Sequence, residues 1–145
     1  MPDITNITIK GTSGYGPISM AYRDKVTATK NSICYEYKPE RECEENTPRK
    51  WSYKTTRADF GDLFAELATS VSAIVSMDQE VDALDVGVTT FIMSYAEGTR
   101  QQRSFCALSY VFATCFRIAK RMVPSCEKTP KVLSTKEDYE ARPET

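Results

Sequence analysis

Two apolar stripes at helical spacing, set among short segments that alternate between apolar and polar residues, constrain the fold of this chain most strongly. Thr56 followed by Asp59 resembles a capping box that begins the first helix, which we expect to end near Met77. Pro124 ends the second. The stripes consist of Phe60, Leu63, Phe64, Leu67, Val71 and Ile74, and of Leu108, Val111, Phe112, Cys115, Ile118, Ala119 and Met122.

The alternating segments predict a β-sheet as the partner of these helices. Four or five strands are expected before the first helix, at 7–10, 18–22, 26–28, 33–37 and 51–53, with a turn at Arg23-Asp24. A second hairpin is expected between the helices, with arms at 86–95 and 99–105 around Ala96-Glu97-Gly98. Its second arm is so polar that it predicts a sheet edge.

The resulting order, β-β-β-β-β-α-β-β-α, predicts an α+β fold. An antiparallel sheet of about five to seven strands should carry both helices on one face. The length of 145 residues suits one domain, which we place at 1–124, followed by a polar tail at 125–145. With 41% hydrophobic and 27% charged residues, the composition is that of an ordinary globular protein.

The sequence predicts a cytoplasmic protein that is neither secreted nor embedded in a membrane. No apolar run approaches the roughly 18 residues of a membrane-spanning helix, and residues 1–10 do not resemble a signal peptide. The 5 cysteines are odd in number and include no C-x-x-C pair, which favours free thiols.

The residue inventory argues against catalysis and against a cofactor or metal. The chain has 0 histidines, so it lacks the commonest acid/base, the usual partner of a nucleophile and the commonest metal ligand. The cysteines have no short ligand pair for zinc. The spacing of Gly11, Gly14 and Gly16 matches neither phosphate-binding fingerprint. We therefore predict no catalytic, cofactor-binding or metal-ligating residue.

Charge is segregated along the chain, although the net charge is -1. Residues 51–98 hold two bases and eight acids, whereas 99–145 hold nine bases and five acids. A calcium loop is excluded because Ala83 and Thr89 stand where such a loop needs glycine and glutamate. The acids in two segments are candidate interaction residues, namely Glu40, Glu42, Glu44, Glu45, Asp78, Glu80, Asp82 and Asp85.

Four further residues are candidates for an interaction surface. Arg100 and Arg103 belong to the basic C-terminal third, but no aromatic residue lies between them and the pI is about 5.6, which argues against nucleic acid as a partner. Trp51 and Tyr53 share one strand face. They suit either an interface or, as we favour, the core.

Three segments carry a resemblance. Ile33-Cys34-Tyr35-Glu36-Tyr37-Lys38-Pro39, Arg49-Lys50-Trp51-Ser52-Tyr53-Lys54-Thr55 and Arg121-Met122-Val123-Pro124 resemble segments of a loose set of small bacterial cytosolic α+β proteins of unassigned function. The resemblance implies a bacterial, cytosolic origin. It implies no activity and no site residue.

The leading hypothesis from sequence is a non-enzymatic module that binds another protein, as a monomer or a homodimer. One alternative is a mobile-element inhibitor of a bacterial defence enzyme that targets nucleic acid, an anti-CRISPR-like protein in which the candidate acids imitate phosphates. A second alternative is a small enzyme without histidine. A binding module should expose a flat or ridged patch, and an enzyme should have a deep pocket with carboxylates of raised pKa.

Overall fold

The computed structural model describes residues 4–12, 22–39, 47–76, 89–105, 110–124 and 131–133 of the chain. Within these ranges the chain forms strands, two α-helices and a short 3-10 helix. The elements are β1 (Ile4–Thr12), β2 (Tyr22–Thr29), β3 (Ser32–Pro39), β4 (Arg49–Lys54), α1 (Ala58–Val75), β5 (Thr89–Tyr95), β6 (Arg100–Phe105), α2 (Tyr110–Met122) and η2 (Lys131–Leu133). The predicted α+β class is confirmed.

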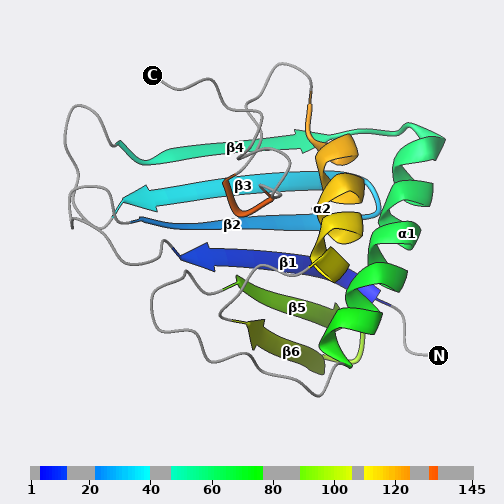
Figure 1. Cartoon of the computed structure of the whole chain (residues 1–145). Helices are drawn as coiled ribbons and strands as arrows, with labels where there is room; N and C mark the ends of the chain where they lie inside the picture. Colours follow the sequence, from blue (N-terminus) through cyan, green and yellow to red (C-terminus); the bar gives the residue numbers. More distant parts are fainter. Residues whose placement is uncertain are drawn as a thin grey trace.

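The strands form one six-stranded antiparallel sheet in the order β4-β3-β2-β1-β5-β6 (Figure 1). The first strand of the chain therefore lies inside the sheet, between β2 and β5. The predicted second hairpin is confirmed from residue 89 onward, and its polar arm β6 forms an edge as expected. Residues 86–88 of its predicted first arm lie outside the described residues. Gly98, in the turn of this hairpin, has a φ of 93°, a backbone conformation that is unfavourable for residues with a Cβ atom.

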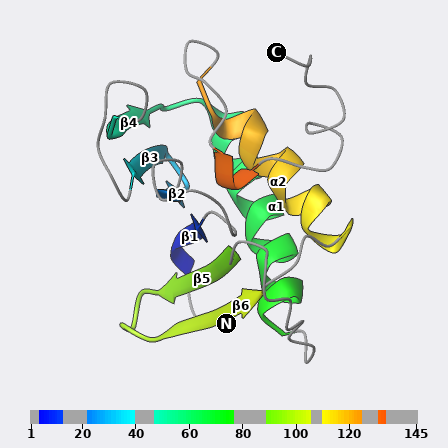
Figure 2. The ribbon, with the colours of Figure 1, turned by 60° about the vertical axis from the view of Figure 1, so that its left-hand side comes forward.

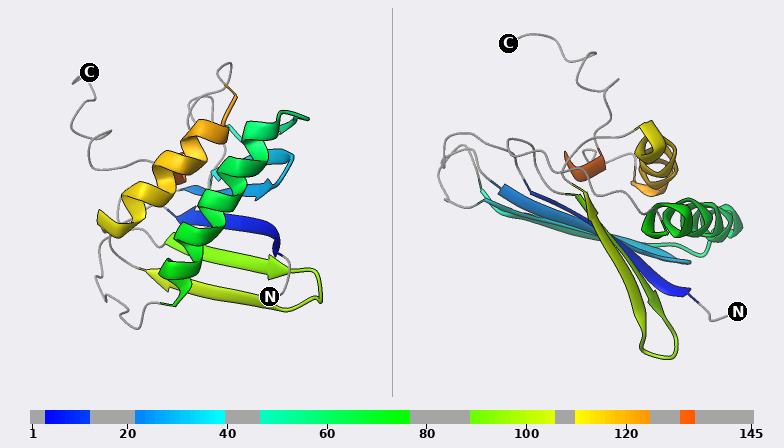
Figure 3. Two further views of the ribbon diagram at one scale, coloured as in Figure 1. Left: turned by 90° about the vertical axis from the view of Figure 1, so that its right-hand side faces the viewer. Right: turned by 60° about the horizontal axis from the view of Figure 1, so that its bottom comes forward.

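Both helices pack on the same face of the sheet, as predicted (Figure 3). They lie side by side and contact each other along their length (Figure 2). Strand residues alternate between the two faces, so the apolar member of each pair points toward the helices. The buried strand residues on this side include Ile7, Ile9, Val26, Ala28, Ile33, Tyr35, Tyr37, Phe91 and Met93.

One aromatic contact ties α2 to the sheet. Phe91 of β5 and Phe116 of α2 are 0% and 1% exposed, and their rings stack with centroids 6.1 Å apart. Such a pair adds roughly 0.5–1.5 kcal/mol to the stabilisation that burial itself provides. The pair therefore helps to hold the second helix on the sheet.

The expected turn at Arg23-Asp24 is wrong, because both residues lie inside β2. Asp24 points to the helix-bearing side and is only 4% exposed. Its Oδ2 accepts hydrogen bonds from the Tyr35 hydroxyl at 2.8 Å and from the backbone N–H of Val132 at 2.9 Å. An acid with such donors can occupy a buried strand position in place of an apolar residue. A prediction from the alternation of apolar residues then fails to recognise the strand at that position. Ile18 and Met20 of the preceding predicted strand lie outside the described residues.

The predicted capping box is also wrong. Helix α1 has Arg57 as its N-cap, with no hydrogen bond from a capping side chain. Asp59 instead forms an ion pair with Arg57, with 3.2 Å between Oδ1 and Nε. Thr55 Oγ1 accepts a hydrogen bond from the N–H of Arg57. The helix ends at Val75, with Ser76 as its C-cap.

The segment η2 belongs to the core, although its sequence predicts only a polar tail. Val132 and Leu133 are 9% and 0% exposed, and η2 packs on β1 and β2. Its close approach depends on Gly11, because a Cβ there would lie 2.7 Å from Val132 Cγ2. Asp24 and Gly11 together make a seat for this turn on the sheet.

Replacing Phe91 with alanine should destabilise the fold by about 3–5 kcal/mol, because the change leaves a cavity where the ring meets Phe116. Urea unfolding at equilibrium measures the change. Thr114→Ala, at an exposed position of α2, is the control and should shift the free energy of unfolding by less than about 0.5 kcal/mol. Equal effects of the two substitutions would contradict this packing.

Replacing Asp24 with alanine should destabilise the fold by about 1–3 kcal/mol, since two buried donors lose their acceptor. Hydrogen exchange should also show faster exchange of the Val132 amide. Tyr35→Phe removes one donor, should cost about 1 kcal/mol, and should leave the Val132 amide protected. Unchanged exchange at Val132 in Asp24→Ala would contradict this anchor.

Candidate binding face

The face of the sheet opposite the helices is polar, and no described element covers it (Figure 3). Alternation along each strand places Thr8 and Lys10 of β1 and Lys25 and Thr27 of β2 on this side. Cys34 of β3 is also exposed here. Ile92 of β5, at 5% exposure, is its buried apolar residue. The described part of this face is therefore hydrophilic.

The charges on this face are almost all positive. Glu36 is the acid on this face among the described residues, whereas the cations come from β1, β2, β3, β4 and β6. We define the basic face as Glu36 together with seven exposed bases, namely Lys10, Arg23, Lys25, Lys38, Lys50, Lys54 and Arg100. The positive charge is thus spread over most strands of the sheet.

The register brings most of these charges into two neighbouring rows. In the first row, Lys50, Glu36, Lys25 and Lys10 lie directly opposite one another on β4, β3, β2 and β1. Neighbouring strands are about 4.8 Å apart. Like charges directly opposite each other destabilise a sheet, and Lys10 and Lys25 form such a pair.

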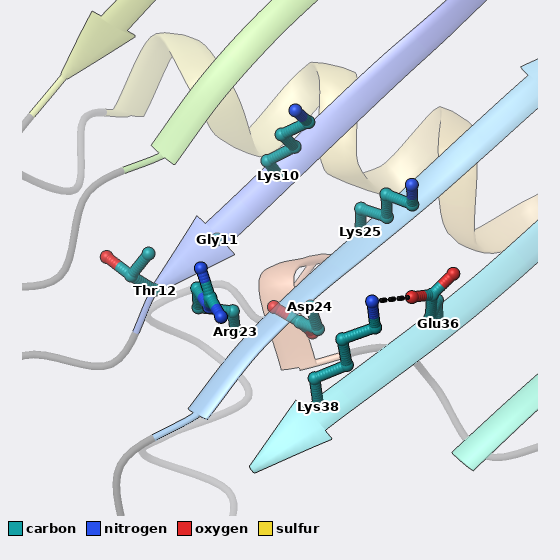
Figure 4. Close-up of a pocket in the computed structure, with 8 residues that line it drawn as sticks. All are labelled: Lys10, Gly11, Thr12, Arg23, Asp24, Lys25, Glu36 and Lys38. Carbon is teal, nitrogen blue, oxygen red and sulfur yellow. Dashed lines mark ion pairs between the residues drawn. The ribbon is translucent and has the colours of Figure 1, made fainter. Parts of the chain in front are cut away.

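The second row lies two residues further along the same strands. It places Lys38 of β3 opposite Arg23 of β2, and Arg23 opposite Thr12 of β1. Lys38 and Arg23 are therefore a second pair of like charges in register. The two rows thus place five bases around Glu36 at this end of the sheet. Figure 4 shows Glu36 with Lys10, Arg23, Lys25 and Lys38.

Glu36 is held in its charged form at the centre of this group. Lys38 Nζ lies 2.8 Å from Glu36 Oε1. The hydrogen bond from Lys38 lowers the pKa of Glu36 below its ordinary value of 4.5, partial burial raises it, and the charges of Lys38, Lys25 and Lys50 lower it further. The carboxylate therefore stays ionised at neutral pH.

An open depression of about 290 Å³ lies among the two rows (Figure 4). Its lining combines four basic residues and Glu36 with residues at the ends of β1 and β2. The lining residues are Lys10, Gly11, Thr12, Arg23, Asp24, Lys25, Glu36 and Lys38. Asp24 lies behind the sheet from this side and accepts the hydrogen bonds that anchor η2. The depression is thus a cationic hollow suited to an oxyanion group.

The aromatic candidates lie on the other side of the sheet. Trp51 and Tyr53 are half-buried and pack against the core. The ring of Trp51 lies 5.8 Å from that of Tyr35, and Tyr53 meets Phe60 edge-on at 6.3 Å. The favoured assignment to the core agrees with these positions.

The remaining candidates are dispersed or not described. Arg100 is exposed and lies opposite Ser94 on the basic face. Arg103 is half-buried and lies opposite Phe91, toward the helices. The candidate acids lie outside the described residues, namely Glu40, Glu42, Glu44, Glu45, Asp78, Glu80, Asp82 and Asp85.

Sequence reasoning missed the cations that carry this face. Lys10 lies on the polar side of an expected strand, and Lys25, Lys38 and Lys50 each directly adjoin the end of one, so that alternation was the available signal. Their convergence also requires the order and register of the strands, which local patterns do not supply.

The comparisons with known proteins do not assign the chain to a family. No protein-family model matches the sequence, and no curated protein matches it. Within the described ranges, neither helix is long and apolar enough to cross a membrane. The same ranges hold no group of three or more acidic or cysteine residues that could bind a metal ion.

Replacing Lys38 with methionine should raise the pKa of Glu36 toward 4.5, because it removes the hydrogen bond that lowers this pKa most. NMR titration of the side-chain carboxyl carbon measures the change. Lys54→Met, which removes a more distant charge of the same face, should leave the pKa unchanged. Equal shifts in the two variants would contradict the assigned cause.

The sign of the effect on stability follows from the lowered pKa. Because the folded state lowers the pKa of Glu36, its contribution to stability is present above pH 4.5 and is lost as the pH falls through the folded value. As the pH falls through this acidic range, the free energy of unfolding of the Lys38→Met variant, measured with urea, should therefore decrease less than that of the parent chain.

Proposed function

We propose that this chain is a non-enzymatic interaction module that holds a negatively charged partner against its basic face. The observation that carries the proposal is the concentration of seven bases with one acid on a single face of a chain whose net charge is -1. Surface charges of one sign steer an oppositely charged partner and raise its rate of association.

The chemistry of the face suits electrostatic contact. The chain has 0 histidines, and the ion pair with Lys38 keeps Glu36 charged rather than ready to exchange a proton. The depression is open, and four of its lining residues are bases. These features support a binding role over the small-enzyme alternative.

The cost of the arrangement to the fold also supports this role. Lys10 and Lys25 face each other across β1 and β2, and like charges directly opposite each other destabilise a sheet. An acid at position 10 would turn this repulsion into attraction. Two lysines in that register therefore suit a role in binding better than a role in stability.

Cross-linking in the cell tests the proposal. A photo-reactive amino acid at Ser52, on the exposed side of β4, should yield adducts with a partner, whereas one at Ser72, exposed on α1, should not. Lys10→Glu/Lys25→Glu should abolish the Ser52 adducts, because it reverses the charge of two bases of the basic face.

The matched control reverses the same amount of charge elsewhere. Lys30→Glu/Arg121→Glu changes the turn after β2 and the exposed end of α2, and should leave the Ser52 adducts in place. Adducts that form equally from Ser72, or that survive reversal of Lys10 and Lys25, would contradict the proposal.

A further inference from the structure

We infer that the partner presents an extended acidic segment of polypeptide, with Asp or Glu at alternate positions, to the basic face. Its successive carboxylates bind between Lys10 and Lys25 and then between Arg23 and Lys38. This inference rests on the proposed function and names the chemistry of the partner. The charge and the spacing of the cation rows are complementary to those of such a segment.

The spacing of the two cation rows matches that of an extended chain. Lys25 and Arg23 are two residues apart on β2, so their Cα atoms are about 6.6–6.8 Å apart along the strand. Side chains on one side of an extended peptide repeat at the same distance. A peptide that lies along β2 can therefore place one carboxylate in each row.

The like-charge pairs give each carboxylate a defined place. Lys10 lies directly opposite Lys25, and Arg23 lies directly opposite Lys38. An oxyanion between the members of a pair interacts with both and screens their mutual repulsion. The depression bounded by these four side chains has about 290 Å³ for the incoming groups.

Glu36 favours a polypeptide over a nucleic acid as the occupant. Its charged carboxylate stands between Lys50 and Lys25 in the first row, where it would repel a uniform run of phosphates. An acidic polypeptide can place a single lysine or arginine opposite Glu36, because its sequence is not uniform in charge. The carboxylate then selects between the two kinds of polyanion.

The described part of the basic face also lacks the groups that hold single-stranded nucleic acid. Its side chains are lysine, arginine, threonine, serine, asparagine and glutamine, with Glu36, Cys34 and Ile92. No aromatic ring of the described residues lies on this side to stack on a base. Contacts there would be limited to phosphates.

Binding of three synthetic probes at low ionic strength tests the inference. The probes are a peptide that alternates glutamate with threonine and carries one central lysine to meet Glu36, a peptide of the same composition with its glutamates in one block, and duplex DNA. Fluorescence anisotropy should show the alternating peptide bound several-fold more tightly than the other two. Lys10→Glu/Lys25→Glu should weaken that peptide on the order of tenfold, whereas Lys30→Glu/Arg121→Glu should not.

Glu36→Gln provides a second readout. It should raise the affinity for duplex DNA more than the affinity for the alternating peptide, because it removes the charge that opposes phosphates. Urea unfolding of Lys10→Glu/Lys25→Glu checks that the variant is folded. A loss of peptide binding in a folded variant then reports on the face itself.

The contrary outcomes separate this inference from the proposed function. Equal affinity for the alternating and block peptides would overturn the spacing, and tighter binding of DNA through the same lysines would identify a nucleic acid instead. In both cases the proposed function would stand. Failure of all three probes to bind would overturn the inference, and absence of Ser52 adducts in the chain without charge reversal would overturn the proposed function as well.

Discussion

The structure depends on the packing of two amphipathic helices against one face of a single antiparallel sheet. Phe91 and Phe116, both almost fully buried, join the second helix to β5, while the first helix contributes a stripe of buried residues from Phe60 to Val75. Because strand side chains alternate, the same packing directs every second residue to the opposite face. The apolar core and the basic face are therefore two consequences of one arrangement.

Asp24 lies on β2 between two residues that belong to the opposite face of the sheet. This acid lies on the helix-bearing side, where Tyr35 and Val132 donate hydrogen bonds to it, while its neighbours Arg23 and Lys25 point to the basic face. Gly11 on the adjacent strand leaves the space that η2 occupies. The strand that carries two cations of the proposed site is thus anchored from behind by the C-terminal turn.

The sequence predicted those helices and strands whose apolar pattern repeats over many residues. The stripe from Phe60 to Ile74 and the alternation from Ile33 to Tyr37 identified a helix and a strand because burial on one side leaves a period in the sequence. The strand position of Asp24 was not predicted, because a buried, hydrogen-bonded acid breaks that apolar period. The burial of Val132 and Leu133 was not predicted, because a three-residue turn is too short to show an apolar period.

The proposed site was harder to predict than the fold, for a physical reason. Each lysine of the basic face is an ordinary exposed residue of its own strand, and only pairing between strands brings Lys10 opposite Lys25. That pairing depends on β1 entering the sheet between β2 and β5, which is a property of the whole chain. Trp51 and Tyr53 were candidates because of their residue types, and they pack against the core, the assignment that the sequence favoured.

We propose that the polar side of the sheet, and not the helices, contacts the partner. Backbone amide chemical shifts followed by NMR during titration with an acidic peptide distinguish the two surfaces. The shift changes should cluster at Lys10, Lys25 and Lys38. Shifts confined to α1 and α2, with those three amides unmoved, would contradict it.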